Sequence, residues 1–152
     1  MDFNSKPLSI EDTSAFDFVK DSLKGDKTSG INFDRLQYDY KNSRYVIIEY
    51  LLCDEKQDYR NINPYTSHPN RYFIKNSMKF ISLWKVTKKL EARLYLINYA
   101  KKESKHSDKV KIMIVKNIDA KISNPVETKD YNVTREEFSK WLRKLNKSGF
   151  KI

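Results

Sequence analysis

The chain of 152 residues has one cysteine, three glycines and four prolines, and no run of 18 or more apolar residues. The single cysteine, Cys53, excludes an internal disulfide framework and cysteine-based zinc sites, and it fits a reducing cytoplasm. Without a long apolar run, a membrane-spanning helix is not expected. The first twelve residues, MDFNSKPLSIED, show no signal-peptide pattern. We therefore expect a cytoplasmic protein with no membrane partner.

Several catalytic motifs are also missing from the sequence. It contains no glycine-rich phosphate-binding loop, no GxSxG nucleophile turn and no HExxH zinc motif. Their absence argues against nucleotide hydrolysis of the P-loop type, serine hydrolysis and zinc proteolysis.

Basic and aromatic residues are abundant. The chain has 30 lysines and arginines against 20 acids, a net charge of +10, together with ten tyrosines and eight phenylalanines. Such a charge favours polyanionic partners, nucleic acid first and an acidic membrane surface second, although a lysine-rich solvated surface has the same composition. The length and the aromatic content predict one ordered domain over residues 1–152, with an irregular arm at residues 1–8.

Residues 32–52 (NFDRLQYDYKNSRYVIIEYLL) have the pattern of an antiparallel hairpin around a polar turn at residues 41–43. A two-residue turn at Lys41-Asn42 would place Asp34 directly opposite Glu49, with their Cβ atoms roughly 5 Å apart. A three-residue turn would leave them diagonal. Glu49 interrupts the most apolar strand of the chain, where a carboxylate is costly to desolvate without a partner. The pair could be two solvated acids, or it could hold a hard divalent ion such as Mg²⁺.

Helical periodicity predicts helices over residues 10–24, 72–90 and 134–149, the last of them a packing helix that opens with a capping box. Alternation predicts strands over residues 91–100 and 109–118, and residues 120–133 are expected to be irregular. The order predicts an α+β or α/β fold, a mixed sheet flanked by helices. On the first helix, Glu11 or Asp12 could cap the first turn or add an acid to the Asp34–Glu49 site.

Residues 54–71 form a long segment in which Pro64 and Pro69 disfavour regular structure. It brings His68, Asn70 and Arg71 close to tyrosines, and Lys75 follows on the next helix. Arginine and tyrosine together suit contacts to phosphates and exposed bases. A solvated connector explains the same composition equally well.

A helix, then a hairpin that opens with an acid and carries a Glu near its end, then a helix and a strand resembles the PD-(D/E)XK nuclease superfamily, which includes restriction enzymes and Holliday-junction resolvases. Phe33-Asp34 resembles the family's "PD" and Glu49-Tyr50-Leu51 its "(D/E)-x-K", within a similarity over residues 10–100. The resemblance implies an αβββαβ restriction-endonuclease-like core, Mg²⁺ or Mn²⁺ bound by Asp34 and Glu49, and DNA rather than RNA as the substrate. Many relatives work as homodimers.

The sequence departs from this pattern at two places. Phe33 replaces the proline, and Leu51 occupies the position of the lysine that orients the attacking water. Some relatives carry that lysine on the following helix, where Lys79 is the first candidate and Lys75 the second. Three readings remain open: a metal-dependent nuclease, a non-cutting nucleic-acid-binding or mobile-element accessory protein, and a basic protein-interaction or inhibitor domain.

Overall fold

The computed structural model describes residues 13–151. The chain divides into two compact units, the first ending at Gly30 and the second starting at Ile31. In the first unit, helix α1 (Ser14–Leu23) ends at Lys24, whose φ of 50° is left-handed. This confirms the C-terminal part of the first predicted helix. Glu11 and Asp12, the two candidates for an additional acid, lie outside the described residues.

The second unit is built on a five-stranded mixed sheet in the order β1-β2-β3-β4-β5. The strands are β1 (Arg35–Asp39), β2 (Arg44–Leu52), β3 (Arg93–Tyr99), β4 (Lys109–Ile118) and β5 (Val126–Thr134). Strands β2 and β3 are parallel and are connected by helix α2 (Phe73–Lys89), whereas every other pair is antiparallel. Helix α3 (Arg135–Ser148) follows β5. The predicted α+β class is confirmed, while the αβββαβ core of the nuclease family stays a prediction.

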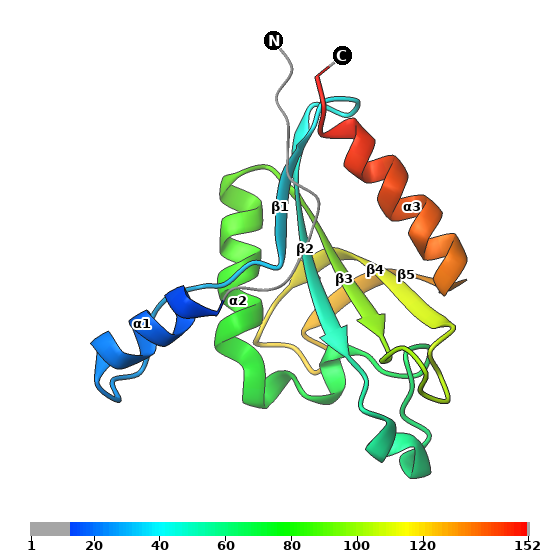
Figure 1. Ribbon diagram of the computed structural model, residues 1–152, viewed down its shortest axis with the longest axis horizontal. Coiled ribbons are helices and arrows are strands. Elements are labelled where there is room, and N and C mark those ends of the chain that lie inside the picture. The colour runs from blue at the N-terminus through cyan, green and yellow to red at the C-terminus, as the bar shows by residue number, and fades with distance from the viewer. Residues whose placement is uncertain (1–12, 152) are drawn as a thin grey trace. The chain divides into compact units, whose positions relative to one another are not determined.

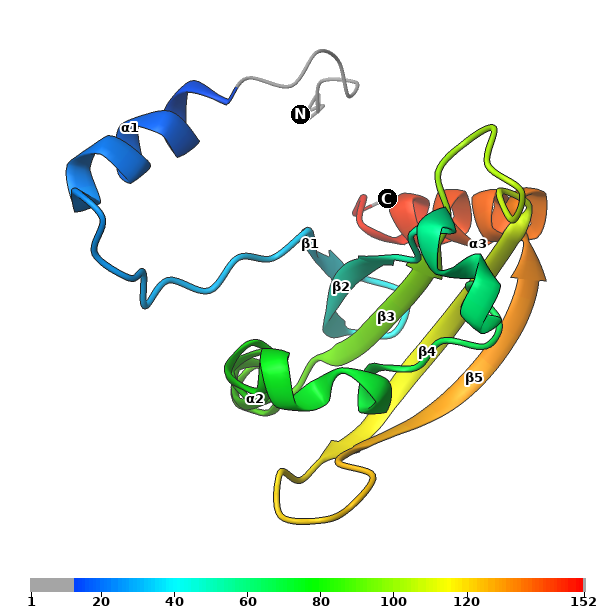
Figure 2. The same cartoon turned by 90° about the horizontal axis from the view of Figure 1, so that it is seen from below.

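The two helices of this unit cover opposite faces of the sheet (Figure 1 and Figure 2). Successive side chains of β2 alternate between these faces, so its apolar run is buried on both sides. Ile47 packs on the α2 side with Phe80 and Leu83, and Ile48 packs on the α3 side. Among the described helices, none is both long and apolar enough to cross a bilayer.

The hairpin has the predicted register but a wider turn. Arg35 pairs with Ile48 and Asp39 with Arg44, which is the register that places Asp34 next to Glu49. Neither the two-residue nor the three-residue turn is present, because the strands separate one pair earlier and residues 40–43 form the loop. The physical reason is Asp39, whose Oδ1 atom accepts hydrogen bonds from the backbone N–H groups of Lys41 and Asn42.

Strand β5 corrects the expectation of an irregular segment at residues 120–133. The strand pairs with β4 along almost its whole length, from Lys109 opposite Thr134 to Ile118 opposite Val126. Its side chains are mostly polar because it forms the outer edge of the sheet, with Val126 as its one buried residue. An edge strand of this kind lacks the apolar alternation on which strand prediction depends.

The connection from β2 to α2 also contains more regular structure than the sequence predicts. Two short 3₁₀ helices lie within it, η1 (Glu55–Arg60) and η2 (Pro69–Arg71). Pro69 is compatible with η2 because it stands at the first helical position, where its missing N–H is not needed.

Candidate functional site

Glu49 and Lys79 form an ion pair between the central strand β2 and helix α2. Strand alternation directs Glu49 to the α2 face together with Ile47 and Leu51. The Glu49 side chain is 6% exposed and the Lys79 side chain 43%, and Lys79 Nζ lies 2.5 Å from Glu49 Oε1. The structure therefore brings together the candidate acid and the first candidate for a relocated lysine.

The electrostatics of Glu49 reflect both its burial and its neighbours. Burial raises the pKa of the Glu49 carboxyl above its usual value, and the negative charge of Asp34 acts in the same direction, while Lys79 opposes them. The backbone N–H of Asp34 also favours the ionised form. Among residues 13–151, no hydrogen-bond partner is found for the buried Oε2 atom of Glu49.

Asp34 immediately precedes β1 and is exposed. Its Oδ2 atom accepts a hydrogen bond of 2.8 Å from the backbone N–H of Tyr50, so the side chain continues the β1–β2 ladder where the backbone of β1 has stopped. Asp34 also lines a groove on the α3 side of the sheet. Glu49 and Asp34 thus lie next to each other at the end of the hairpin, with Glu49 directed to α2 and Asp34 at the entrance to the α3 side.

Glu49 and Asp34 both carry carboxylate oxygens, the type of ligand that a hard divalent cation prefers. Mg²⁺ prefers carboxylate and carbonyl oxygens and keeps several waters, so one or two carboxylates suffice to hold it. The buried Oε2 atom of Glu49 has an unused lone pair, and the nearby charge of Asp34 raises the pKa of Glu49, an effect that a cation would reverse. In the described part of the chain no cluster of three His, Cys, Asp or Glu residues is present, so any ion would depend on these two acids.

The two remaining lysine positions differ in their surroundings. Leu51, at the family's lysine position, is 8% exposed and packs in the core against α2. Lys75 is exposed four residues before Lys79, on the other side of Asn76, where the backbone of α2 is not helical. Leu51 thus contributes to the core, and of the two lysines on α2 it is Lys79 that reaches Glu49.

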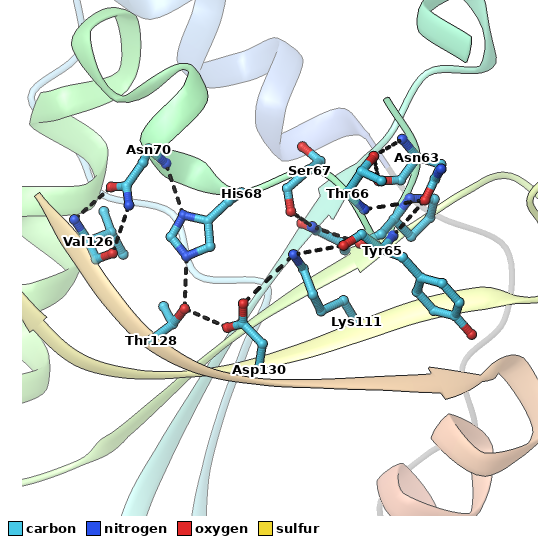
Figure 3. Close-up of polar contacts among 12 residues, drawn as sticks. Asn63, Tyr65, Thr66, Ser67, His68, Asn70, Lys111, Val126, Thr128 and Asp130 are labelled. Atoms are coloured by element: carbon cyan, nitrogen blue, oxygen red, sulfur yellow. Dashed lines mark hydrogen bonds and ion pairs between the residues drawn. The ribbon is translucent and has the colours of Figure 1, made fainter. Parts of the chain in front are cut away.

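The segment with the other sequence candidates is fastened to β5 (Figure 3). Asn70 accepts a hydrogen bond from the Val126 N–H at 2.8 Å and donates one to the Val126 carbonyl at 3.0 Å. His68 Nδ1 accepts from the Asn70 N–H, and His68 Nε2 lies 2.8 Å from Thr128 Oγ1. Arg71 is exposed, with its guanidinium over the ring of Tyr72. Arg71 and Lys75 are both exposed, and Arg71 Nη2 donates a hydrogen bond to Ser67 Oγ at 3.3 Å. Asn70 and His68 have bonds within the protein as well, so the role of all four residues in nucleic-acid binding stays a prediction.

Sequence reasoning missed a buried lysine beneath this segment. Lys111 on β4 is 5% exposed, and its Nζ donates to the Tyr65 carbonyl at 3.2 Å and lies 3.8 Å from Asp130 (Figure 3). Burial lowers the pKa of Lys111, and it lowers the pKa of His68 as well. The signal was in the alternation of β4, since Lys111 shares a face with the core residues Met113 and Val115.

A second missed feature is a groove between the sheet and α3, which we call the aromatic groove. Its volume is about 460 Å³, and it is lined by Asp34, Tyr50, Ile97, Tyr99, Val110, Arg135, Phe138 and Leu142. No single stretch of sequence could reveal it, because its walls come from the hairpin, β3, β4 and α3.

No protein-family model matches this chain, and neither the curated proteins nor the solved structures include a match.

Proposed function

We propose that this protein is a metal-dependent nuclease that hydrolyses phosphodiester bonds of nucleic acid, with DNA as the substrate. The observation that carries the proposal is the buried Glu49 carboxylate, which is paired with Lys79, influenced by the charge of Asp34, and left with one oxygen that has no hydrogen-bond partner in the described part of the chain. A buried acid with a perturbed pKa and a specific charged partner is typical of a functional site.

Each residue has a chemical role in this proposal. Glu49 and Asp34 would supply the carboxylates for Mg²⁺ or Mn²⁺, and the backbone carbonyl of Tyr50 would be a further oxygen donor. A divalent cation held there would make a bound water more acidic and would neutralise charge at the phosphate. Lys79 replaces the lysine that is missing at Leu51: its ammonium group, half exposed at the edge of α2, orients the water or stabilises the developing negative charge.

The second candidate is a nucleic-acid-binding protein of the same fold that does not cut. The observation that favours it is the engagement of both acids within the chain: Lys79 neutralises one oxygen of Glu49, and Asp34 Oδ2 accepts from the Tyr50 N–H. In this case Lys79 takes the place of the cation permanently, and the net charge of +10 remains as the basis of binding.

Cleavage assays separate the two candidates. Plasmid, single-stranded DNA and RNA are incubated with the protein in Mg²⁺, in Mn²⁺ and in EDTA, and the products are resolved on gels. We expect cleavage only with the cations. Glu49→Gln and Asp34→Asn should abolish it, and Lys79→Met should slow it about 100-fold, the usual effect of removing one group that stabilises transition-state charge.

The matched controls are Glu127→Gln on β5 and Lys85→Met on α2, which change an exposed acid and an exposed lysine away from the site. Both should cleave like the wild type. Cleavage that survives Glu49→Gln would indicate a contaminant, and salt-sensitive binding without cleavage would leave the non-cutting protein as the answer.

A further inference from the structure

The aromatic groove has apolar walls that include three aromatic rings. The rings of Tyr50 and Tyr99 meet edge to face with centroids 6.4 Å apart, and Phe138 of α3 joins the lining. Tyr50, Tyr99 and Phe138 are all partly exposed, so the fold leaves their surfaces accessible. Aromatic side chains in an open groove are the usual platform for a planar ring.

Polar groups also lie among these walls. Arg135 donates from Nε to the Ser107 carbonyl and from Nη2 to the Ala100 carbonyl, each at 2.6 Å, so its guanidinium is fixed in place. Tyr50 and Tyr99 add their hydroxyl groups to the same lining. A ligand in the groove therefore meets a rigid donor as well as stacking surfaces, which is the composition of a specific small-ring site.

The net charge of the protein and the position of the groove favour one kind of planar ligand, a nucleic-acid base. The protein carries a net charge of +10, which favours a ligand attached to a polyanion. Asp34, which belongs to the candidate cation site, is also part of the groove lining. A volume of about 460 Å³ is within the range of pockets that bury a small molecule, and it exceeds the space that a single base needs. A strand bound at Asp34 would have a base within reach of Tyr50.

We propose that the aromatic groove receives one base of a single-stranded nucleic acid, which stacks against Tyr99 and Phe138 and accepts a hydrogen bond from Arg135. This inference rests on the proposed function, since it names the substrate form of the same site. A duplex keeps its bases stacked inside the helix, so only a single-stranded or flipped base can enter. The preferred substrate is therefore single-stranded nucleic acid.

The experiment measures binding in EDTA, where no cleavage occurs. Fluorescence anisotropy compares three labelled 12-mers: oligo(dT), the same length of abasic backbone, and a duplex. The wild type should bind oligo(dT) roughly ten-fold more tightly than the abasic strand, because base–aromatic stacking adds to phosphate contacts. It should also bind oligo(dT) more tightly than the duplex.

Two variants remove the rings but keep apolar volume, Phe138→Leu and Tyr99→Leu, and Arg135→Lys alters the fixed donor. Each should reduce the preference for oligo(dT) over the abasic strand at least several-fold and leave abasic binding unchanged. The matched control is Tyr40→Leu in the β1–β2 loop, a tyrosine that is 46% exposed and is not part of the groove lining. Circular dichroism establishes that each variant is folded, and Arg135→Lys serves as the test if a ring variant does not fold.

Equal binding of oligo(dT) and the abasic strand by the wild type would overturn the inference, and so would an unchanged preference in the folded variants. The results that would reject the nuclease proposal differ from those that would reject the groove as a base site. A base preference without metal-dependent cleavage would support the groove and reject the nuclease. Metal-dependent cleavage by a wild type that shows no base preference would support the nuclease and reject the groove as a base site.

Discussion

Glu49 is the acid that is costly to bury, and it is also the residue on which the proposed chemistry depends. The sequence predicted that an acid inside an apolar strand needs a partner, and it named Lys79 before Lys75 on the following helix. The ion pair of 2.5 Å agrees with that order. The sequence could not show that Asp34 bonds to the Tyr50 N–H, because this contact depends on where the β1 backbone ends.

The raised pKa of Glu49 gives a prediction for stability. A carboxyl whose folded pKa lies above its unfolded value binds more protons in the folded state between the two values. Its contribution is therefore fully present below the unfolded pKa and is lost as the pH rises through the folded pKa. We expect Glu49→Gln to gain stability relative to the wild type as the pH rises from about 4.5 towards neutrality.

Urea denaturation of both proteins across this pH range measures the effect, with Glu127→Gln as the control. The control difference should be flat with pH, because Glu127 is exposed on β5. The difference in the free energy of unfolding between Glu49→Gln and the wild type could instead stay constant with pH or change in favour of the wild type. Either result would show that Lys79 fully compensates the cost of burying ionised Glu49.

At the scale of elements, hydrophobic periodicity predicted those helices and strands that have an apolar face. The hairpin, α2, β3, β4 and α3 follow their patterns because each buries side chains on at least one side. Strand β5 escaped prediction because its residues are mostly polar, and its conformation comes from pairing with β4 and from side chains in the connection between β2 and α2. The two walls of the aromatic groove likewise come from elements distant in sequence.

Asn70 shows how that connection supports β5. Its side chain satisfies both the N–H and the carbonyl of Val126, at the first residue of the strand. Asn70→Ala leaves both groups unpaired and should lower the free energy of unfolding by about 1–3 kcal/mol. Asn70→Asp keeps the acceptor and loses the donor, so it should also destabilise.

Chemical denaturation of the Asn70 variants tests this, with Asn132→Ala as the control. Asn132 is an exposed asparagine on the same strand, and its replacement should change stability by less than about 0.5 kcal/mol. If Asn70→Ala lowers the free energy of unfolding no more than Asn132→Ala does, Val126 does not depend on its two hydrogen bonds to Asn70. Weakened nucleic-acid binding by a fully stable Asn70→Ala would instead support the predicted contact role of Asn70.

At the scale of the whole molecule, composition predicted a partner class but no interface. A net charge of +10 attracts any polyanion, and the exposed Arg71 and Lys75 are the candidates for phosphate contacts. The placement of these two cations near one end of α2 follows from the chain order, whereas their exposure depends on the folded structure.

The salt dependence of binding tests that assignment. The logarithm of the affinity for single-stranded DNA should fall linearly with the logarithm of the salt concentration. Arg71→Gln and Lys75→Gln should each lower the slope by about 0.7, the value for one phosphate contact on a single strand. Lys121→Gln, in the β4–β5 connection, is the control and should leave the slope unchanged. An unaltered slope in both variants would exclude these residues from the interface.

Cation binding by Asp34 and Glu49 is the claim on which the proposed chemistry depends, and titration of the protein with Mn²⁺, followed by electron paramagnetic resonance, measures it without any substrate. We predict saturable binding of one or two ions per chain, which Glu49→Gln and Asp34→Asn abolish, which Glu127→Gln leaves intact, and which weakens at low pH as Glu49 takes up its proton. Binding that is absent from the wild type, or equal in Glu49→Gln, would contradict the account.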